Sequence, residues 1–378
     1  MQISESGDPM IDAKPGATRV AVIGAGYWGT NYIRIFSELQ DARVVTVCDS
    51  RSDRLDAVSR SLPVRITNDA AEAITSPDTD AVAIVTDAST HRHLAGMALE
   101  AGKHVLVEKP LTTTTKEASE LIDLAERRGR TLMVGHTFLY NPGVLAVKEY
   151  VATGEVGDVY YLYSQRTSLG PIRSDVNAIW DLAPHDIAIQ NYLLDLTPAW
   201  VSAVGANPVR HSLQDVGFIT LGYPGGTIGH IHVSWADPNK VRQVVVVGSE
   251  KRVLFNDMDS VEQVRVFDKG VKSVDDPESA RYGEHILQLR DGAITSPPIP
   301  ALEPLKTQCG AFIHGIRGRH APLTDGAQGR EVVRVLEAVD QSMAMQGGPV
   351  AIPPTVPDTS ADRAAAASRV GNLERALP

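Results

Sequence analysis

The chain contains 378 residues, a length that favours two domains over a single hydrophobic core. Hydrophobic residues make up 43% and charged residues 22%, a composition typical of globular proteins and not of disordered or fibrous ones. The formal net charge of -10 disfavours unspecific binding to nucleic acids or anionic lipids, so neither is expected as a partner. Cys48 and Cys309 lie far apart without further ligand residues nearby, so we expect no disulfide framework and no metal site.

The amino-terminal segment carries neither a secretory nor a membrane-spanning pattern. Residues 1–17 are polar and acidic and contain Pro and Gly, which predicts a flexible leader. The sequence has no run of about twenty apolar residues, the length needed to span a bilayer, so we expect no membrane partner. Together with the scarcity of cysteine, these features predict a cytoplasmic protein in a reducing compartment.

Short β-branched runs alternate with helical segments from Arg19 to about Gly135. This alternation is typical of a parallel sheet that helices cover on both faces. Crossover helices are expected in segments such as Thr30 to Leu39 and His91 to Gly102. The expected strands are RVAVIG, RVVTVCD, VRIT, AVAIVTD, HVLVEKP and TLMVGH. We therefore predict an α/β domain with a doubly wound parallel sheet, a Rossmann domain, over residues 18–138.

The pattern changes after Tyr140. Helices are expected from Pro142 to Ala152 and from Asp181 to Leu194. Turn residues, rather than crossover helices, separate the later apolar runs, which indicates a largely antiparallel open sheet. These runs are VYYLYSQRTS, WVSAVGA, VGFITLGY, GGTIGHIHVSW, VRQVVVVG, KRVLFN and VEQVRVF. We predict an α+β domain over residues 139–348.

The carboxyl-terminal part combines a helical segment with a polar tail. Helical periodicity returns from Gln308 to Gln346. Residues 349–378 contain a PP pair, a Ser/Thr/Asp cluster and an Ala run, which predicts a weakly anchored tail.

Gly24, Gly26 and Gly29 stand in VIGAGYWG, between the first strand run and a helical segment. In this context a GxGxxG spacing permits a tight turn, close approach of a pyrophosphate and tight packing of helix on strand. The amino terminus of the helix offers unpaired N–H groups to the phosphates. We therefore expect a dinucleotide here, with Tyr27 and Trp28 of the same turn among its contacts. Taken alone, the spacing also fits an ordinary strand-to-helix turn.

Asp49 ends the second strand run, twenty residues after Gly29. A carboxylate there accepts hydrogen bonds from the adenosine ribose and repels a 2′-phosphate, so we predict NAD as the cofactor rather than NADP. Arg51 and Arg54 follow closely and are able to pair with a 2′-phosphate, which keeps NADP as the alternative. Asp49 would otherwise begin an ordinary turn, with the arginines on a solvated helix.

Lys109 stands at the carboxyl end of the fifth strand run, the edge of a parallel sheet at which ligands bind. Pro110 constrains this lysine, although a lysine at a strand end is more often a surface charge. Glu108, Lys109 and Pro110 together resemble the signature of the Gfo/Idh/MocA family of NAD(P)-dependent oxidoreductases. The resemblance implies that Glu108 and Lys109 contact the cofactor.

The segment VTDASTHRHLA resembles the same family. This resemblance implies that Thr86 and His91 lie beside the cofactor. Asp87 stands where proline is common in the family. This difference is expected to alter the shape of the loop more than its role.

The segment WDLAPHDIAIQNYLL resembles the active-site helix of the family, with Asp181 and His185 four residues apart and so on one helix face. Hydride transfer to NAD leaves an alcohol proton that a base must remove. The resemblance assigns this role to His185, which Asp181 orients, while Lys109 donates to the substrate oxygen and stabilises the alkoxide. Alternatively, Asp181 is a helix cap and His185 a packing residue.

The resemblance extends from Arg19 to Gln346. Its last part, PLTDGAQGREVVRVLEAV, implies a closing helix at about 328–346 that packs back on the first domain. The family includes oxidoreductases of inositols, free sugars, sugar phosphates and nucleotide-linked sugars, so membership alone leaves the substrate open.

Two segments narrow the substrate: GYWGTNYIR, and GHTFLYNP followed by RTSLGPIRSDVNAIWDLAPHD. They resemble the branch of the family that oxidises the 3-hydroxyl of UDP-N-acetylglucosamine or its uronic acid to a 3-keto sugar. The expected substrate contacts are Lys109, Tyr140, Asn141, Arg166, Arg173, Asn177 and His185. Arginine suits a diphosphate because its planar fork donates two hydrogen bonds, although arginines in loops are usually solvated. His136, Tyr140 and Asn141 either reach the sugar or form a domain-crossing turn at Pro142.

Other functions stay open at this point. They are an NADPH-dependent 3-ketoreductase of deoxysugar biosynthesis, a sugar-phosphate or inositol dehydrogenase, and an NAD-binding regulatory subunit without chemistry. The set of Lys109, Asp181 and His185 disfavours the regulatory subunit, because a binding module needs no base beside the nicotinamide. An open sheet face rich in β-branched and aromatic residues would expose an apolar patch, so we predict a homodimer or homotetramer through it.

Overall fold

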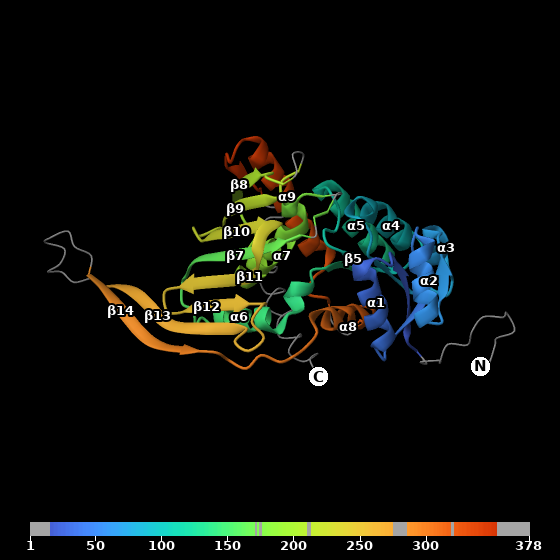
Figure 1. Ribbon diagram of the computed structural model, residues 1–378, viewed down its shortest axis with the longest axis horizontal. Helices are drawn as coiled ribbons and strands as arrows, with labels where there is room; N and C mark the ends of the chain where they lie inside the picture. Colours follow the sequence, from blue (N-terminus) through green and yellow to red (C-terminus); the bar gives the residue numbers. More distant parts are fainter. Residues whose placement is uncertain are drawn as a thin grey trace. The chain divides into compact units, whose positions relative to one another are not determined.

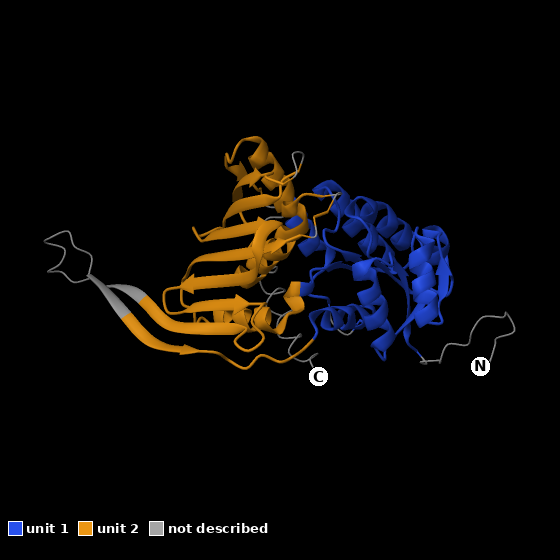
Figure 2. Cartoon of the chain, viewed as in Figure 1, with its two compact units in different colours: residues 1–137, 303–334, 364–378 blue, residues 138–302, 335–363 orange. Residues whose placement is uncertain are grey.

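The computed structural model describes residues 16–170, 172–173, 176–209, 213–274, 286–318 and 321–353. The chain forms two compact units (Figure 2). Among the described residues, the first unit runs to Thr137 and includes Glu303–Arg334. The second unit consists of Phe138–Leu302 and of the described residues after Arg334. The chain first passes from one unit to the other between Thr137 and Phe138.

The first unit is built on a six-stranded parallel sheet in the order β3-β2-β1-β4-β5-β6 (Figure 1). Its strands are β1 (Thr18–Ile23), β2 (Ala42–Cys48), β3 (Arg65–Thr67), β4 (Ala81–Ile84), β5 (His104–Glu108) and β6 (Leu132–Gly135). The intervening helices are α1 (Tyr27–Glu38), α2 (Ser52–Ser61), α3 (Ala70–Thr75), α4 (Ala88–Glu100) and α5 (Thr115–Arg128). The strand order reverses between β1 and β4, which confirms the predicted doubly wound sheet.

Local capping and burial explain these elements. The Thr114 hydroxyl accepts a hydrogen bond from the Glu117 amide at the start of α5, and Gly129 in the left-handed conformation (φ 59°) ends this helix. Strands β4 and β6 are buried at every residue, because helices cover both faces of a parallel sheet.

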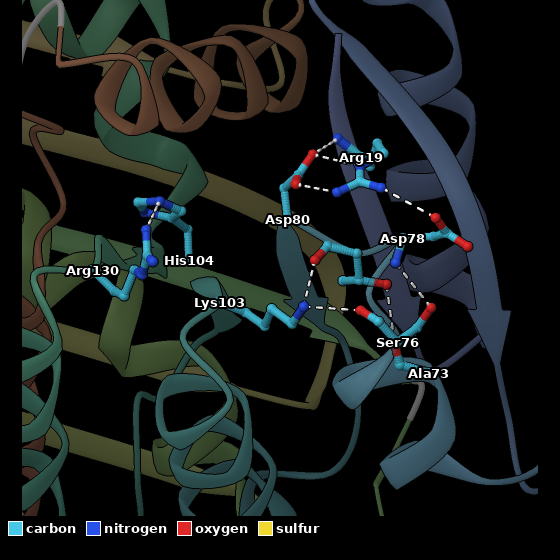
Figure 3. Close-up of polar contacts among 9 residues, drawn as sticks. Arg19, Ala73, Ser76, Asp78, Asp80, Lys103, His104 and Arg130 are labelled. Carbon is cyan, nitrogen blue, oxygen red and sulfur yellow. Dashed lines mark hydrogen bonds and ion pairs between the residues drawn. The ribbon is translucent and has the colours of Figure 1, made fainter. Parts of the chain in front are cut away.

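Charged side chains gather at the amino ends of the strands (Figure 3). Arg19, in β1, donates to Asp80 through Nε at 3.0 Å and Nη2 at 2.8 Å. Lys103, just before β5, donates to the carbonyl oxygens of Ser76 at 2.9 Å and Thr79 at 2.6 Å. These contacts join β1, β4 and β5 at the edge opposite to their carboxyl ends, so they stabilise the sheet rather than a ligand site.

Two carboxyl-terminal helices return to the first unit, α8 (Pro304–Ile316) and α9 (Gly326–Ala344). Helix α8 packs against α1, and the Thr324 hydroxyl donates to the Val134 carbonyl of β6 at 2.7 Å. Helix α9 belongs to the first unit as far as Arg334 and to the second unit after it.

The second unit is built on a nine-stranded sheet in the order β14-β13-β12-β11-β7-β10-β9-β8-β15 (Figure 1). Its strands are β7 (Val159–Leu169), β8 (Trp200–Ala206), β9 (Val216–Gly222), β10 (Ile228–Ser234), β11 (Ala236–Gly248), β12 (Arg252–Asn256), β13 (Val264–Val274), β14 (Ile286–Thr295) and β15 (Val350–Ala351). Neighbours run antiparallel except β7 and β10, which confirms a largely antiparallel sheet. Neither β14 nor β15 was predicted, and β15 lies in the segment predicted as a tail.

Helix α7 (Ala178–Leu194) packs against β7, β9 and β10. Inward residues of these strands, such as Leu162 and Ile231, are buried, and their neighbours along the strand point to the other face. Lys148 of α6 (Pro142–Ala152) is buried, donates to the Leu193 carbonyl at 3.3 Å and pairs with Asp195. An ammonium so placed satisfies carbonyl groups at the carboxyl end of α7.

Aromatic side chains lie on the other face of this sheet. Phe218 stacks on His232 with ring centroids 4.4 Å apart, and Tyr161 stacks on Tyr163 at 6.4 Å. Phe218, Tyr161 and Val204 are exposed. Association through this face stays a prediction, which the molar mass in solution checks.

Within the described part of the chain, no helix has both the length and the apolar character to cross a bilayer. The cytoplasmic location stays a prediction. Both thiols, of Cys48 and Cys309, are buried and unbridged. Most of the predicted leader, residues 1–15, and of the predicted tail, residues 354–378, lies outside the described residues.

His104 predicts a pH-dependent contribution to stability. Its Nδ1 accepts a hydrogen bond from the Thr131 amide at 3.0 Å, and burial, followed by the charge of Arg130, lowers the pKa of His104 to about 4 (Figure 3). An unfolded histidine titrates at about pH 6.5. Between about pH 6.5 and 4 the unfolded chain binds a proton that the folded chain does not. The free energy of unfolding therefore decreases as the pH is lowered through this range.

We therefore expect His104→Asn, which keeps an acceptor for the Thr131 amide, to lose less Tm than the wild type between about pH 7 and 5. Calorimetry across this range checks it. His93→Asn removes an exposed histidine of α4 and serves as the control. Parallel Tm curves for His104→Asn and the wild type would contradict the prediction.

Candidate active site

Most residues of the first unit that were predicted to contact the cofactor or the sugar lie along the carboxyl edge of its sheet. Gly24 and Asp49 directly follow β1 and β2, Thr86 lies shortly after β4, and Lys109 and His136 directly follow β5 and β6. The registers Ile23↔Cys48, Ile23↔Ile84, Ile84↔Val107 and Glu108↔Gly135 set these strand ends side by side. In open parallel sheets, this edge is the one that binds ligands.

The glycine turn after β1 is packed so closely that side chains do not fit. Gly24 has φ 99°, and its amide donates to the Cys48 carbonyl at 2.7 Å. A Cβ atom on Gly24 would overlap the carbonyl oxygen of Val85, and one on Gly29 would overlap the carbonyl oxygen of Gly24. The turn therefore needs glycine at both positions.

Helix α1 begins at this turn with open amide groups. Gly26 is its N-cap residue, and no side chain among the described residues caps the helix. Its first amides are thus available to an anion, as the pyrophosphate of a dinucleotide requires. Tyr27 and Trp28 form an edge-to-face pair with centroids 5.9 Å apart, and both are exposed in the first helical turn. The residues present therefore fit a dinucleotide.

The Asp49 carboxylate is buried at the same turn. Its Oδ2 accepts hydrogen bonds from the Ala25 amide at 2.7 Å and from Arg54 at 3.2 Å, and its Oδ1 accepts from the Arg51 amide at 2.9 Å. Burial alone would raise the pKa of Asp49, but the two amides and the Arg54 guanidinium outweigh it, and the pKa lies below its usual value. A carboxylate oxygen accepts two hydrogen bonds, so Oδ1 retains a lone pair for a ribose hydroxyl.

His91 connects two loops at this edge and is itself buried. Its Nδ1 lies 2.7 Å from the Pro110 carbonyl oxygen, and its Nε2 lies 3.1 Å from the Thr86 carbonyl oxygen. The Thr86 hydroxyl is hydrogen-bonded to that of Thr90 at 2.7 Å. His91 therefore holds the loop after β4 against the residue that follows Lys109, and its direct contact with a cofactor stays a prediction.

Lys109 follows Glu108 in the chain, and its charge acts on the buried imidazole of His136. Its amide donates to Oε2 of Glu108 at 3.0 Å, and its peptide bond to Pro110 is cis. His136 is 1% exposed, and neither of its ring nitrogens has a hydrogen-bond partner among the described residues. Burial, followed by the charge of Lys109, lowers the pKa of His136 to about 3. A neutral imidazole with one donor and one acceptor thus lies near Lys109.

In the second unit, Asp181 and His185 share one face of α7. Asp181 accepts a hydrogen bond from Arg173 at 3.3 Å. The half-buried ring of His185 packs edge-on against Phe138, with centroids 5.0 Å apart. The sequence did not single out Phe138, whose contact with His185 crosses from η1 (Thr137–Tyr140) to α7.

Arg166 forms a buried ion pair with the residue that follows His185. Its Nε and Nη2 donate to the two carboxylate oxygens of Asp186 at 2.7 and 3.2 Å. Its guanidinium also lies 4.1 Å from the ring centroid of Phe138, on which His185 packs. Burial raises the pKa of Asp186 in spite of Arg166. The pair therefore supports the His185 region, and the substrate contact of Arg166 stays a prediction.

The remaining predicted substrate residues, Tyr140, Asn141 and Asn177, are buried or cap helices. Tyr140 is fully buried. Asn141 caps α6 by accepting from the Gly143 amide at 2.9 Å, and Asn177 caps α7 by accepting from the Trp180 amide at 2.9 Å. The cap formed by Asn141 corresponds to the turn at Pro142 that the sequence left as an alternative. The substrate contacts of Tyr140, Asn141 and Asn177 stay predictions.

The chain is similar to known oxidoreductases along most of its length. Residues 18–136 match the model of the Gfo/Idh/MocA oxidoreductase family, NAD-binding Rossmann fold, and residues 144–254 match the Gfo/Idh/MocA C-terminal domain. The chain is 26% identical to UDP-N-acetylglucosamine 3-dehydrogenase of Acidithiobacillus ferrooxidans, over 83% of this chain and 94% of that protein. It is 25% identical to myo-inositol 2-dehydrogenase of Thermotoga maritima, over 86% of this chain and 96% of that protein.

One solved structure with the same fold is the WlbA dehydrogenase of Bordetella pertussis in complex with NADH and UDP-GlcNAcA. Its TM-score is 0.75 at 20% identity, over 92% of this chain and 100% of that chain. The chain therefore belongs to the Gfo/Idh/MocA family of oxidoreductases and is an NAD-binding enzyme that acts on a sugar or polyol hydroxyl.

Proposed function

We propose that the enzyme oxidises the 3-hydroxyl of UDP-N-acetylglucosamine, or of its uronic acid, to a 3-keto sugar with NAD. The observation that carries this proposal is the match to a relative named UDP-N-acetylglucosamine 3-dehydrogenase across 94% of that protein. A second candidate is the oxidation of an inositol, which the match to a myo-inositol 2-dehydrogenase favours.

The proposed reaction divides the chemistry among three side chains. Bound NAD supplies the acceptor for the hydride from the sugar carbon. His185 removes the hydroxyl proton, and the carboxylate of Asp181, one helical turn away, stabilises the resulting imidazolium. Lys109 donates to the substrate oxygen and stabilises the alkoxide as it develops.

Arg173 would couple diphosphate binding to this chemistry. Its guanidinium pairs with Asp181 at 3.3 Å, and its side chain is 35% exposed. A planar guanidinium binds a diphosphate through two parallel hydrogen bonds. If the diphosphate bound Arg173, its ion pair with Asp181 would break. The Asp181 carboxylate would then be available to stabilise the imidazolium of His185.

The direct test is NADH formation by the wild type with UDP-N-acetylglucosamine, its uronic acid, myo-inositol and a hexose phosphate. We expect NADH only with the UDP-sugars, and a slower rate when deuterium replaces hydrogen at C3 but not at C4. His185→Ala should lower kcat by roughly two to four orders of magnitude with unchanged NAD affinity, because it removes the base. Oxidation of inositol alone would support the second candidate, and failure with every substrate would reject both.

The carboxylate of Asp49 predicts the choice of cofactor. Its negative charge repels a 2′-phosphate, whereas Arg54, 3.2 Å away, would attract one. We expect Asp49→Asn to narrow the preference for NADH over NADPH by about tenfold or more, the effect of removing one charge at a buried site. Titration calorimetry with both cofactors measures it.

Asp56→Asn is the matched control, because it removes a carboxylate of the same charge from an exposed position of the neighbouring helix α2 without altering the pairing of Arg51 or Arg54. A preference that changes equally in the two variants would contradict the role of Asp49.

A further inference from the structure

A continuous line of hydrogen bonds runs through the first unit to the residue before Lys109. The Thr137 hydroxyl donates to Oε1 of Gln308 at 2.7 Å, and Nε2 of Gln308 donates to the Tyr32 hydroxyl at 2.8 Å. Tyr32 in turn donates to Oε1 of Glu108 at 2.5 Å. The line therefore connects η1, α8, α1 and the end of β5.

The donors along this line all point towards Glu108. Because the Gln308 amide donates to the Tyr32 oxygen, the one phenolic hydrogen of Tyr32 is left for the Glu108 carboxylate. Burial, followed by the charge of Glu108, raises the pKa of Tyr32 well above its usual range, so this hydrogen is retained. The second Glu108 oxygen accepts from the Lys109 amide. Glu108 thus accepts at both oxygens, as a carboxylate does.

The surroundings leave this carboxylate little freedom. Tyr32 and Gln308 are both fully buried. A Cβ atom on Gly135 would lie 2.9 Å from Oε1 of Glu108 and 3.1 Å from the Tyr32 hydroxyl, so glycine is what leaves room for the carboxylate. In close-packed surroundings of this kind, a side chain with satisfied hydrogen bonds keeps one orientation.

We propose that Tyr32 and Gln308 are positioning residues for Lys109, which act by fixing the Glu108 carboxylate beside it. Neither residue contacts the reacting atoms in this role. The inference rests on the catalytic role proposed for Lys109. It assigns a function in the active site to α8, a helix that comes from the far end of the sequence.

The first test replaces the two side chains one at a time. Tyr32→Phe removes the donor to Glu108, and Gln308→Met removes the bond one step further away. We expect kcat to fall by roughly tenfold in Tyr32→Phe and by less in Gln308→Met, because a lost bond to a charged group misplaces that group. A matched control is Phe36→Leu, which alters a buried ring that packs on Tyr32 in α1 without touching the hydrogen bonds. It should lower Tm and leave kcat unchanged.

A double variant separates positioning from general destabilisation. If Tyr32 acts through Glu108, adding Tyr32→Phe to Glu108→Gln lowers kcat by less than about twofold further, because the group that Tyr32 holds has already changed. Losses that multiply, or a kcat in Phe36→Leu that falls as far as in Tyr32→Phe, overturn the proposal.

A measurement without substrate keeps this inference distinct from the proposed function. Acetic anhydride at limiting concentration labels lysines, and mass spectrometry gives the ratio of labelling at Lys109 to that at the exposed Lys116 of α5. We expect Tyr32→Phe to change this ratio by about threefold or more, because the reactivity of an amine follows its charged surroundings, and Phe36→Leu to leave it unchanged. An unaltered ratio in Tyr32→Phe overturns the proposal even if the wild type oxidises a UDP-sugar. A wild type that turns over no substrate, with an altered ratio, rejects only the proposed function.

Discussion

The parallel pairing of β4, β5 and β6 is the constraint on which the chemistry of the first unit depends. It sets the carboxyl ends of these strands side by side, so that Thr86, Lys109 and His136 face one edge of the sheet. The charged cluster around Arg19 lies at the amino ends and stabilises the opposite edge. The contacts that stabilise the sheet thus lie at one edge, and the residues proposed to bind ligand lie at the other. The side chains around Lys109 are therefore not needed for those stabilising contacts.

In the second unit, a buried ion pair and an aromatic ring position His185, the proposed base. A buried ion pair needs good hydrogen-bond geometry between its partners, and two hydrogen bonds join Arg166 to Asp186. The same guanidinium covers Phe138, whose ring supports His185. The position of His185 thus depends on a strand, a 3-10 turn and a helix together, and not on α7 alone.

The sequence predicted the strands of the first sheet, the glycine turn and the family, because these depend on local periodicity and on motifs such as that around Lys109. It did not predict that Gln308 reaches Tyr32, because hydrogen bonds between residues so distant in the chain leave no local pattern. For Asn141, residue type was compatible with both a cap and a substrate contact. Strand β14 was missed because the segment Arg290–Gly292 interrupts its apolar alternation.

In the proposed reaction, Lys109 and His185 act on the same substrate hydroxyl. Single-turnover rates of NADH formation with a UDP-sugar, for Lys109→Met, His185→Ala and the double variant, test it directly. Groups that act as a unit are strongly non-additive, so the double variant should be slower than the slower single variant by less than about tenfold. A rate in the double variant that equals the product of the two separate losses would contradict the account.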